Sequence, residues 1–252
     1  MTTTETAPTA GPIKGSSPRF KARLIGLFYA IGGVTGAFGE FFVRDKLFVP
    51  NDAVATAANI LAQEPLYRLA GSLELIGIAF EVALVALLYD LFRPVSKTLS
   101  LTAALFRFLH AILFSANSLT HFAPLLLLGG APYLSVFKTD QLQAMAYTSL
   151  RFHAMNFRIV LMFFGIHCVL LGYLILRSSF LPRILGLLIA ISGLSYLAAT
   201  FAYFLALPLP AGTNNYLLAL NAPGEAGLML WLLTVGVNER KWKEQARAAA
   251  GL

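Results

Sequence analysis

Charged residues are scarce in this chain. Asp, Glu, Lys and Arg make up 12% of its 252 residues, whereas a soluble domain carries about 25%. Hydrophobic residues account for 58% of the sequence, and its mean hydropathy is +0.72. This composition excludes an ordinary soluble globular domain and indicates a protein that crosses a membrane several times.

Cysteine and metal-binding motifs are also scarce. Cys168 is the only cysteine, so an intramolecular disulfide is impossible, and we interpret its thiol as a small buried hydrophobic group. The sequence has no His-Glu-x-x-His motif and no pair of cysteines, so it predicts no metal site and identifies no cofactor. A mixed Glu and His site assembled from several helices stays open as an alternative.

Six apolar runs are long enough to cross a bilayer as helices, which requires about 20 residues each. They cover residues 24–43, 66–92, 98–128, 156–176, 182–207 and 215–237. None has the short alternating pattern of a membrane β-barrel strand, and helices are then the remaining way to satisfy backbone groups in lipid. We therefore predict an all-α, polytopic integral membrane bundle with six transmembrane helices.

Basic residues are distributed unevenly between the two sides of these runs. With both termini in the cytoplasm, twelve of the 19 Lys and Arg residues lie on the inner side, and only Arg44, Lys46 and Lys138 lie on the outer side. This bias is a positive-inside signal, and it explains the net charge of +7. We expect a membrane protein whose partner is the lipid bilayer, with no role in nucleic-acid binding.

The chain divides into one membrane domain and two tails. Residues 1–20 are polar and predict a disordered cytoplasmic tail, residues 21–240 form the six-helix membrane domain, and residues 241–252 form a basic cytoplasmic tail. The external loop at 44–65 is expected to carry a short surface helix after Asp52. Tyr67 and other tyrosines near the outer boundary indicate an interfacial aromatic belt.

Polar side chains recur on one face of the third apolar run. Arg107, His110, Asn117 and His121 fall within an arc of about 80° when the run is wound as a helix. Ionisable groups inside a membrane are costly and usually face a protein interior or a wet cavity. This stripe therefore predicts a polar interior in the bundle.

One level of polar residues lies near the middle of the membrane, and we interpret it as structural pairing. Its members are Glu81, Arg107, His110 and His167. The second and third spans are joined by a tight turn and so are antiparallel neighbours. Because a lone charge at mid-helix costs roughly 2.5–3.5 kcal/mol, Glu81 should pair with Arg107 or His110.

A second level lies in the outer half of the membrane, and we interpret it as a candidate ligand site. Its members are Glu74, Asn117, His121 and His153, with Glu225 from the last span. Glu74 could pair with Asn117 or His121 across the same antiparallel contact. Three titratable groups at one level exceed what a structural contact requires, so we expect a cavity that opens outward. No catalytic residue is indicated.

The position of Glu225 depends on where the last helix begins. A start at Asn221 makes Glu225 a first-turn acid, which the helix dipole favours. A start near Asn215 places a kink at Pro223, so that Glu225 faces broken backbone, as in many transporter sites. We favour the second alternative, because the first leaves a short helix.

The first span is rich in glycine and includes a Gly32-xxx-Gly36 pair. Small residues allow helices to approach closely in lipid. Either internal packing or a homodimer contact through Gly32 and Gly36 would use this feature.

Three segments resemble a known family. They are the run from Phe163 to Gly186, the stretch at 55–60, and Gly224-Glu225 followed by Leu230-Trp231-Leu232-Leu233. Together they resemble a bacterial family of six-span proteins classified as domain of unknown function 4386, over about residues 23–237. The resemblance implies a bacterial cytoplasmic membrane protein, and it supplies no reaction, ligand or catalytic residue.

Three functions are compatible with this sequence. The first is binding or transport of a small polar or lipidic ligand in the polar cavity. The second is a membrane-embedded enzyme that acts on a lipid or isoprenoid. The third is a structural or accessory protein whose polar residues only fix the register of its helices.

Overall fold

The computed structural model describes residues 17–208, 210 and 213–251, and these residues form helices and connecting turns. Residues 1–16 of the expected N-terminal tail lie outside the described part. The elements in chain order are α1 (Pro18–Ala37), the π-helix η1 (Phe38–Arg44), α2 (Asp45–Leu47), α3 (Ala53–Ala62), α4 (Glu64–Phe92), α5 (Lys97–Leu128), the 3-10 turn η2 (Pro132–Leu134), α6 (Thr139–Arg177), α7 (Arg183–Phe204), α8 (Thr213–Ala219), α9 (Asn221–Thr234) and α10 (Glu239–Ala249).

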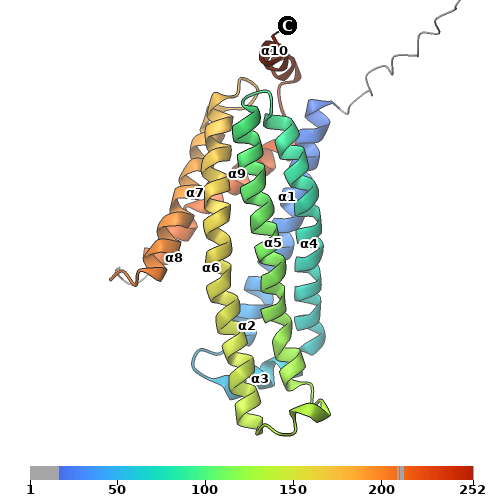
Figure 1. Ribbon diagram of the computed structural model, residues 1–252, viewed down its shortest axis with the longest axis vertical. Helices are drawn as coiled ribbons and strands as arrows, with labels where there is room; N and C mark the ends of the chain where they lie inside the picture. Colours follow the sequence, from blue (N-terminus) through green and yellow to red (C-terminus); the bar gives the residue numbers. More distant parts are fainter. Residues whose placement is uncertain (1–16, 209, 211–212, 252) are drawn as a thin grey trace, which may run out of the picture.

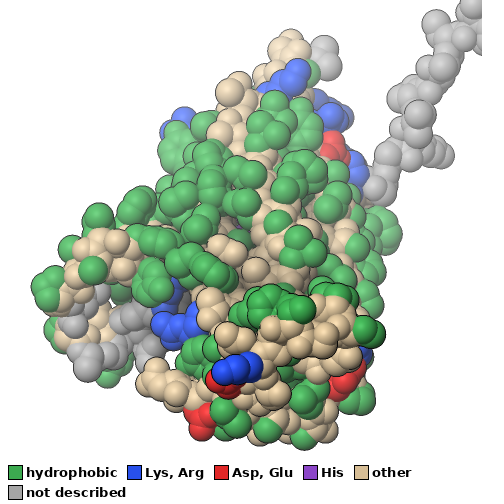
Figure 2. Space-filling model, turned by 60° about the horizontal axis from the view of Figure 1, so that its bottom comes forward, with side chains coloured by type: hydrophobic (Ala, Val, Ile, Leu, Met, Phe, Trp, Pro, Cys, Tyr) green, Lys and Arg blue, Asp and Glu red, His purple; other side chains and the backbone are tan. Residues whose placement is uncertain are grey.

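Five helical segments in the described part of the chain are long and apolar enough to cross a membrane. They are Pro18–Leu47, α4, α5, α6 and α7. Large hydrophobic side chains remain exposed along the outside of the bundle, as expected for a surface that faces lipid (Figure 2). The all-helical fold is therefore confirmed for the described residues, and five of the six expected spans have the length and composition of a membrane-spanning helix.

The last apolar run differs from the favoured prediction of one helix kinked at Pro223. A break at Leu220 separates α8 from α9, and α9 begins at Asn221. Pro223 then lies in the first turn of α9, where a missing N–H costs no helical hydrogen bond. The prediction of a continuous kinked helix was wrong, because proline is more easily accommodated at a helix start than inside a helix.

Local sequence signals fix where several of these helices begin. The Ser17 hydroxyl accepts a hydrogen bond from the Phe20 N–H, and Ser96 does the same for Leu99. Asp52 caps α3 by accepting from the Ala55 N–H, so the short helix expected in the 44–65 loop is present. Such caps satisfy N–H groups that the first helical turn leaves free.

Helices α4 to α7 pack as successive antiparallel neighbours, and α9 lies between α1 and α7 (Figure 1). The beginning of α1 lies at the same end of the bundle as α10, which we call the α10 end. The opposite end carries α3 and is called the α3 end. At the α10 end, α10 is attached by a hydrogen bond from the Trp242 indole to the Leu91 carbonyl (2.8 Å).

The first span does not stop at Val43 as the sequence suggested. It continues as the π-helix η1 and then as α2, through Leu47. A π-helical turn carries an extra residue and therefore changes the face on which later side chains lie. The Arg44 side chain is only 12% exposed as a result, and it points into the bundle rather than into an external loop.

Candidate functional site

A cluster around Arg107 lies between α1, α4 and α5. Glu81 Oε1 is 2.6 Å from Arg107 Nε and 2.6 Å from His110 Nδ1. Arg107 also donates to the Tyr29 hydroxyl (3.2 Å), and its guanidinium stacks between the rings of Tyr29 and Phe164, at 4.8 and 4.5 Å. Both partners that the sequence offered for Glu81 are therefore present, and Tyr29 and Phe164 add contacts that it did not indicate.

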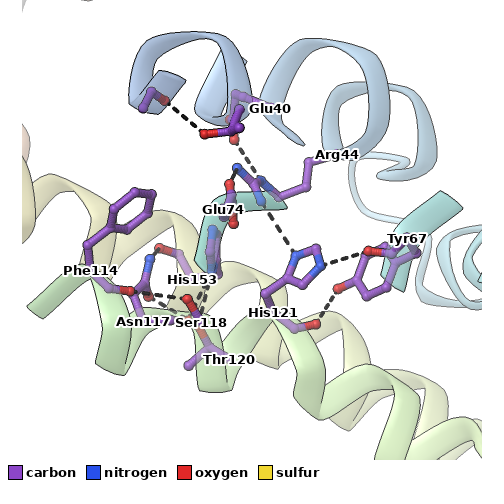
Figure 3. Close-up of polar contacts among 12 residues, drawn as sticks. Glu40, Arg44, Tyr67, Glu74, Phe114, Asn117, Ser118, Thr120, His121 and His153 are labelled. Atoms are coloured by element: carbon purple, nitrogen blue, oxygen red, sulfur yellow. Dashed lines mark hydrogen bonds and ion pairs between the residues drawn. The ribbon is translucent and has the colours of Figure 1, made fainter. Parts of the chain in front are cut away.

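A second cluster surrounds Arg44 (Figure 3). Arg44 Nε donates to Glu40 Oε2 at 2.7 Å, and Nη2 donates to Glu74 Oε1 at 2.5 Å. Nη1 lies 3.5 Å from His121 Nδ1. Glu74 was expected to pair with Asn117 or His121, and this was wrong. The π-helix brings Arg44 within reach, and a carboxylate forms a stronger hydrogen bond with a guanidinium than with an amide.

His121 is held by the chain rather than free to bind a ligand. Its Nε2 lies 3.1 Å from the Tyr67 carbonyl oxygen, and the Tyr67 hydroxyl donates to the His121 carbonyl at 2.5 Å. The two rings stack with centroids 4.1 Å apart. Because Nε2 faces a carbonyl oxygen, we assign the proton to Nε2, which leaves Nδ1 as the acceptor that faces Arg44.

The Tyr67 side chain is buried among these contacts. Tyr67 is 1% exposed, so its expected place in an interfacial belt was wrong.

Asn117 and His153 join α5 to α6. The Asn117 amide donates to the His153 carbonyl (3.2 Å), and His153 Nδ1 lies 3.3 Å from the Asn117 carbonyl oxygen. Thr120 and Ser149 extend this contact: the Thr120 hydroxyl lies 3.2 Å from His153 Nδ1, and the Ser149 hydroxyl donates to the Thr120 carbonyl at 2.8 Å. These reciprocal contacts fix the register of two helices, which is a structural role.

His167 is buried and lies apart from the hydrogen bonds of the Arg107 cluster. Its Nδ1 lies 2.8 Å from the Ala103 carbonyl oxygen, so this nitrogen is the donor and the contact joins α6 to α5. Nε2 is buried with no hydrogen-bond partner among the described residues. Cys168, next in sequence, is fully buried, as expected of a small hydrophobic group.

Glu225 lies on α9, one residue beyond its first turn, away from the other ligand-site candidates. Its Oε1 accepts a hydrogen bond from the Tyr196 hydroxyl at 2.5 Å. One turn earlier, the Asn221 side chain accepts from Ser195, and its backbone carbonyl accepts from Ser192 at 3.2 Å. The expected assembly of Glu225 with Glu74, His121 and His153 is absent from the contacts of the described residues, because α9 lies on the opposite side of a cavity.

That cavity, which we call the central cavity, has a volume of about 630 Å³. Its polar lining comes from both clusters and from α1, α7 and α9: Tyr29, Thr35, Glu40, Arg44, Glu74, Glu81, Arg107, His110, Tyr196, Asn221 and Glu225. Phe114, Phe157 and Phe164 form part of its apolar wall. Its size and its mixture of apolar wall and a few converging polar groups are typical of a small-molecule site.

A second cavity of about 420 Å³ lies beside the first, toward the α3 end, and we call it the α6 cavity. It shares Glu40, Phe41, Arg44, Phe157 and Leu161 with the central cavity. The residues that distinguish it are Asp45, Leu47, Phe48, Ile60, Tyr67, Leu150, Arg151, His153, Ala154 and Arg158. Arg44 and Glu40 therefore lie in the wall between the two cavities.

The candidate ligand residues are thus divided by the structure. Glu74 and Glu225 line the central cavity, and His153 lines the α6 cavity, whereas Asn117 and His121 line neither and hold helices together. The described residues contain no group of three or more His, Cys, Asp or Glu side chains that could hold a metal ion.

Sequence reasoning missed three further members of the site, and Arg44 was assigned to an external loop. Glu40 was an acidic residue inside an apolar run, and Glu40 and Arg44 have the spacing of an i, i+4 ion pair. That spacing was the available signal. Tyr29 and Tyr196 carried none, because each is a tyrosine inside an apolar run with no charged residue three or four positions away.

Comparison with known proteins identifies a relative and a family. An uncharacterised protein of the archaeon Archaeoglobus fulgidus is 29% identical over 164 residues, which cover 63% of this chain and 78% of the relative. This relative is archaeal, so it does not support the expected bacterial source. No solved structure matches the chain. The family described as Domain of unknown function (DUF4386) matches residues 24–236. The chain therefore belongs to the DUF4386 family of uncharacterised proteins, as the resemblance of its motifs implied.

Proposed function

We propose that this membrane protein binds a small organic cation in its central cavity. The observation that carries the proposal is an excess of acid in the lining. Of the described residues that line the cavity, four are carboxylates, Glu40, Glu74, Glu81 and Glu225, and two are arginines, Arg44 and Arg107. The acidic side chains therefore outnumber the arginines in this lining. An uncompensated charge inside a membrane is costly, so a bound cation would stabilise this arrangement.

Glu225 is the best candidate for the direct contact with the ligand. Glu40 and Glu74 share Arg44, and Glu81 has Arg107 and His110. Glu225 accepts a hydrogen bond from the neutral Tyr196 hydroxyl and has no cationic partner among the residues described. Tyr29, Tyr196, Phe114, Phe157 and Phe164 also line the cavity, and aromatic faces attract organic cations by about 0.5–2 kcal/mol each.

The route to the cavity supports a ligand that partitions into lipid. Gly33 and Val34 on α1 and Ala222 and Ala226 on α9 line the cavity and are exposed. The cavity therefore opens sideways between α1 and α9. Gly33 lies 15 residues beyond the start of α1, which is about 22 Å along the helix and within the hydrocarbon of a bilayer about 30 Å thick. A lipophilic amine or quaternary cation could enter there.

We also propose that α8 and α9 together complete a sixth crossing, with the α10 end in the cytoplasm of a prokaryotic cell. The beginning of α1 and α10 share one end of the bundle, and basic residues are concentrated in the segments at that end. Single cysteines at Lys138 and Glu244, in a Cys168→Ala background, would test this orientation with a membrane-impermeant maleimide in intact cells. Labelling at 138 and protection at 244 is expected, and the reverse pattern would overturn the proposal.

The binding proposal can be tested with two probes of the same shape and opposite charge. Purified full-length protein in detergent would be titrated with tetraphenylphosphonium and with tetraphenylborate by calorimetry. We expect Glu225→Gln to weaken phosphonium binding at least tenfold, which corresponds to about 1.4 kcal/mol. The same substitution should leave borate binding unchanged or strengthen it, because a negative charge has been removed.

Glu244→Gln is the matched control, because Glu244 lies on α10 with a 60% exposed side chain. It should bind both probes like the unmodified protein. Thermal unfolding of each variant would verify that the fold is retained. Equal effects of Glu225→Gln on both probes, or no effect on either, would contradict a cation site. Chemical conversion of a lipid by the purified protein would instead support the enzyme alternative.

A further inference from the structure

The α6 cavity contains two arginines that have no acidic partner in the described part of the chain. Arg151 and Arg158 lie seven residues apart on α6 and line this cavity, so they share one face of the helix, two turns apart. Neither forms an ion pair with any carboxylate among the described residues. By contrast, Arg44 and Arg107 in the bundle interior are both paired.

The depth of Arg158 places it at a membrane boundary. Arg158 lies 19 residues before Arg177, where α6 ends at the α10 end. That separation is about 28 Å along the helix, close to the thickness of the hydrocarbon layer. The neighbouring helix α7 ends at the same level, since the Arg158 guanidinium lies 4.2 Å from the ring of Tyr203 in its last turn. Exposed Tyr203 is an interfacial residue type.

The remaining lining suits an amphiphile whose head group is anionic. Phe41, Phe157 and Leu161 provide apolar wall, and Phe41 is 63% exposed, so the cavity is open to lipid tails on that side. Figure 2, which looks toward the α3 end, shows Lys and Arg side chains in a recess between the body of the bundle and the arm formed by α7 and α8.

The charges of this lining leave an excess of one positive charge. Arg44, Arg151 and Arg158 face the cavity together with Glu40 and Asp45. The Arg44 guanidinium is already occupied by Glu40 and by Glu74, so the lining guanidiniums that pair with no described carboxylate are those on α6. A guanidinium forms paired, charge-assisted hydrogen bonds with phosphate oxygens.

We propose that the α6 cavity binds the phosphate group of an anionic phospholipid from the leaflet nearer the α3 end. The phosphate lies between Arg151 and Arg158, and an acyl chain follows Phe41, Phe157 and Leu161. The phosphate position is separate from the cation site, because neither Arg151 nor Arg158 lines the central cavity, whereas the apolar wall along the acyl chain is shared by the two cavities.

The test is native mass spectrometry of delipidated full-length protein titrated with phosphatidylglycerol. The double variant Arg151→Gln/Arg158→Gln is expected to bind this lipid at least tenfold more weakly. Arg68→Gln is the matched control, since Arg68 is a 58% exposed arginine paired with Glu64 in the same half of the bundle, and it should bind normally. Arg158→Lys keeps the charge but loses the paired geometry, and intermediate binding is expected.

Two further arms separate a lipid from other ligands. Inorganic phosphate at 10 mM should not displace the lipid, and displacement would overturn the lipid assignment in favour of a soluble phosphate. The double variant should bind tetraphenylphosphonium like the unmodified protein. Unchanged lipid binding by the folded double variant, or an equal loss in Arg68→Gln, would overturn the proposal.

Discussion

Tyr67 on α4 and His121 on α5 hold each other through two hydrogen bonds that run in opposite directions. The tyrosine hydroxyl donates to the histidine carbonyl, and the histidine ring faces the tyrosine carbonyl. Their stacked rings complete the contact. Each residue thus satisfies a backbone carbonyl of the other helix. The Arg44 guanidinium lies 3.5 Å from Nδ1, the second ring nitrogen of His121. The pair therefore supports the wall of the site without lining the central cavity.

Tyr67→Phe tests the strength of this contact. The substitution removes the hydroxyl and leaves the His121 carbonyl without its side-chain donor, so the free energy of unfolding should fall by about 1 kcal/mol. Thermal unfolding in detergent would measure the change. Tyr216→Phe is the matched control, because Tyr216 is 76% exposed, and it should unfold at the original temperature. Equal stability of the two variants would show that the hydroxyl contributes nothing.

The Glu81 and Arg107 pair predicts non-additive substitutions. Arg107→Gln alone leaves Glu81 buried with only His110 beside it, and removing one partner of a buried ion pair costs about 3–5 kcal/mol. Adding Glu81→Gln removes the orphaned charge, so the double variant should recover part of the loss. Unfolding curves of both single variants and the double variant would measure the coupling. Additive losses would mean that the two residues act independently.

Much of this geometry followed from the sequence, because it depends on regular helices and short connections. The turn after Phe92 makes α4 and α5 antiparallel neighbours, so Glu81 was correctly placed opposite Arg107 and His110. Asn117 and His121 were placed on the interior face, where both are buried.

The errors in placing Arg44 and Glu225 occurred where the backbone departs from regular α-helix. Hydropathy ended the first span at Val43, whereas the π-helix η1 turns Arg44 inward to Glu74. The break at Leu220 placed Glu225 opposite Tyr196 rather than beside Glu74. A pattern of apolar residues reveals only the regular period of a helix, so it indicates neither a π-helical turn nor a break between two helices. The division of the polar residues into two cavities depends on both features, so it could not be predicted from helical counting.

Two glycines of α1 predict opposite responses to the same change. A Cβ at Gly26 would lie 2.8 Å from the Leu233 Cα of α9, whereas a Cβ at Gly33 would meet nothing within 4 Å. Gly26→Ala should therefore force α1 and α9 apart and lower the unfolding temperature. Gly33→Ala should keep or raise it, because alanine favours a helix by about 1 kcal/mol over glycine. Unfolding of both variants in detergent gives the comparison.

Gly33→Leu extends this comparison to the opening of the central cavity. The larger side chain would project into the exposed gap between α1 and α9, so it should slow or weaken tetraphenylphosphonium binding while the protein remains folded. Binding at the original affinity and rate would argue against entry between these helices.

A homodimer through Gly32 and Gly36 stays a prediction. It would be indicated if Gly36→Leu changed the mass of the protein–detergent complex in light scattering.

Trp242 predicts how firmly α10 is attached to the membrane domain. Its indole donates to the Leu91 carbonyl at the end of α4 (2.8 Å), and Gln245 accepts from the Ser179 N–H (3.0 Å) in the turn after α6. Trp242→Phe removes the first of these hydrogen bonds, worth about 1 kcal/mol, and should raise the detached population of α10 about fivefold. Limited tryptic cleavage after Lys241 and Lys243 would accelerate to the same extent if cleavage follows detachment.

Trp231→Phe is the matched control, because the Trp231 indole has no hydrogen-bond partner among the described residues. Equal cleavage rates in the two variants would mean that α10 is held by its other contacts, since the indole hydrogen bond would then contribute no measurable stability.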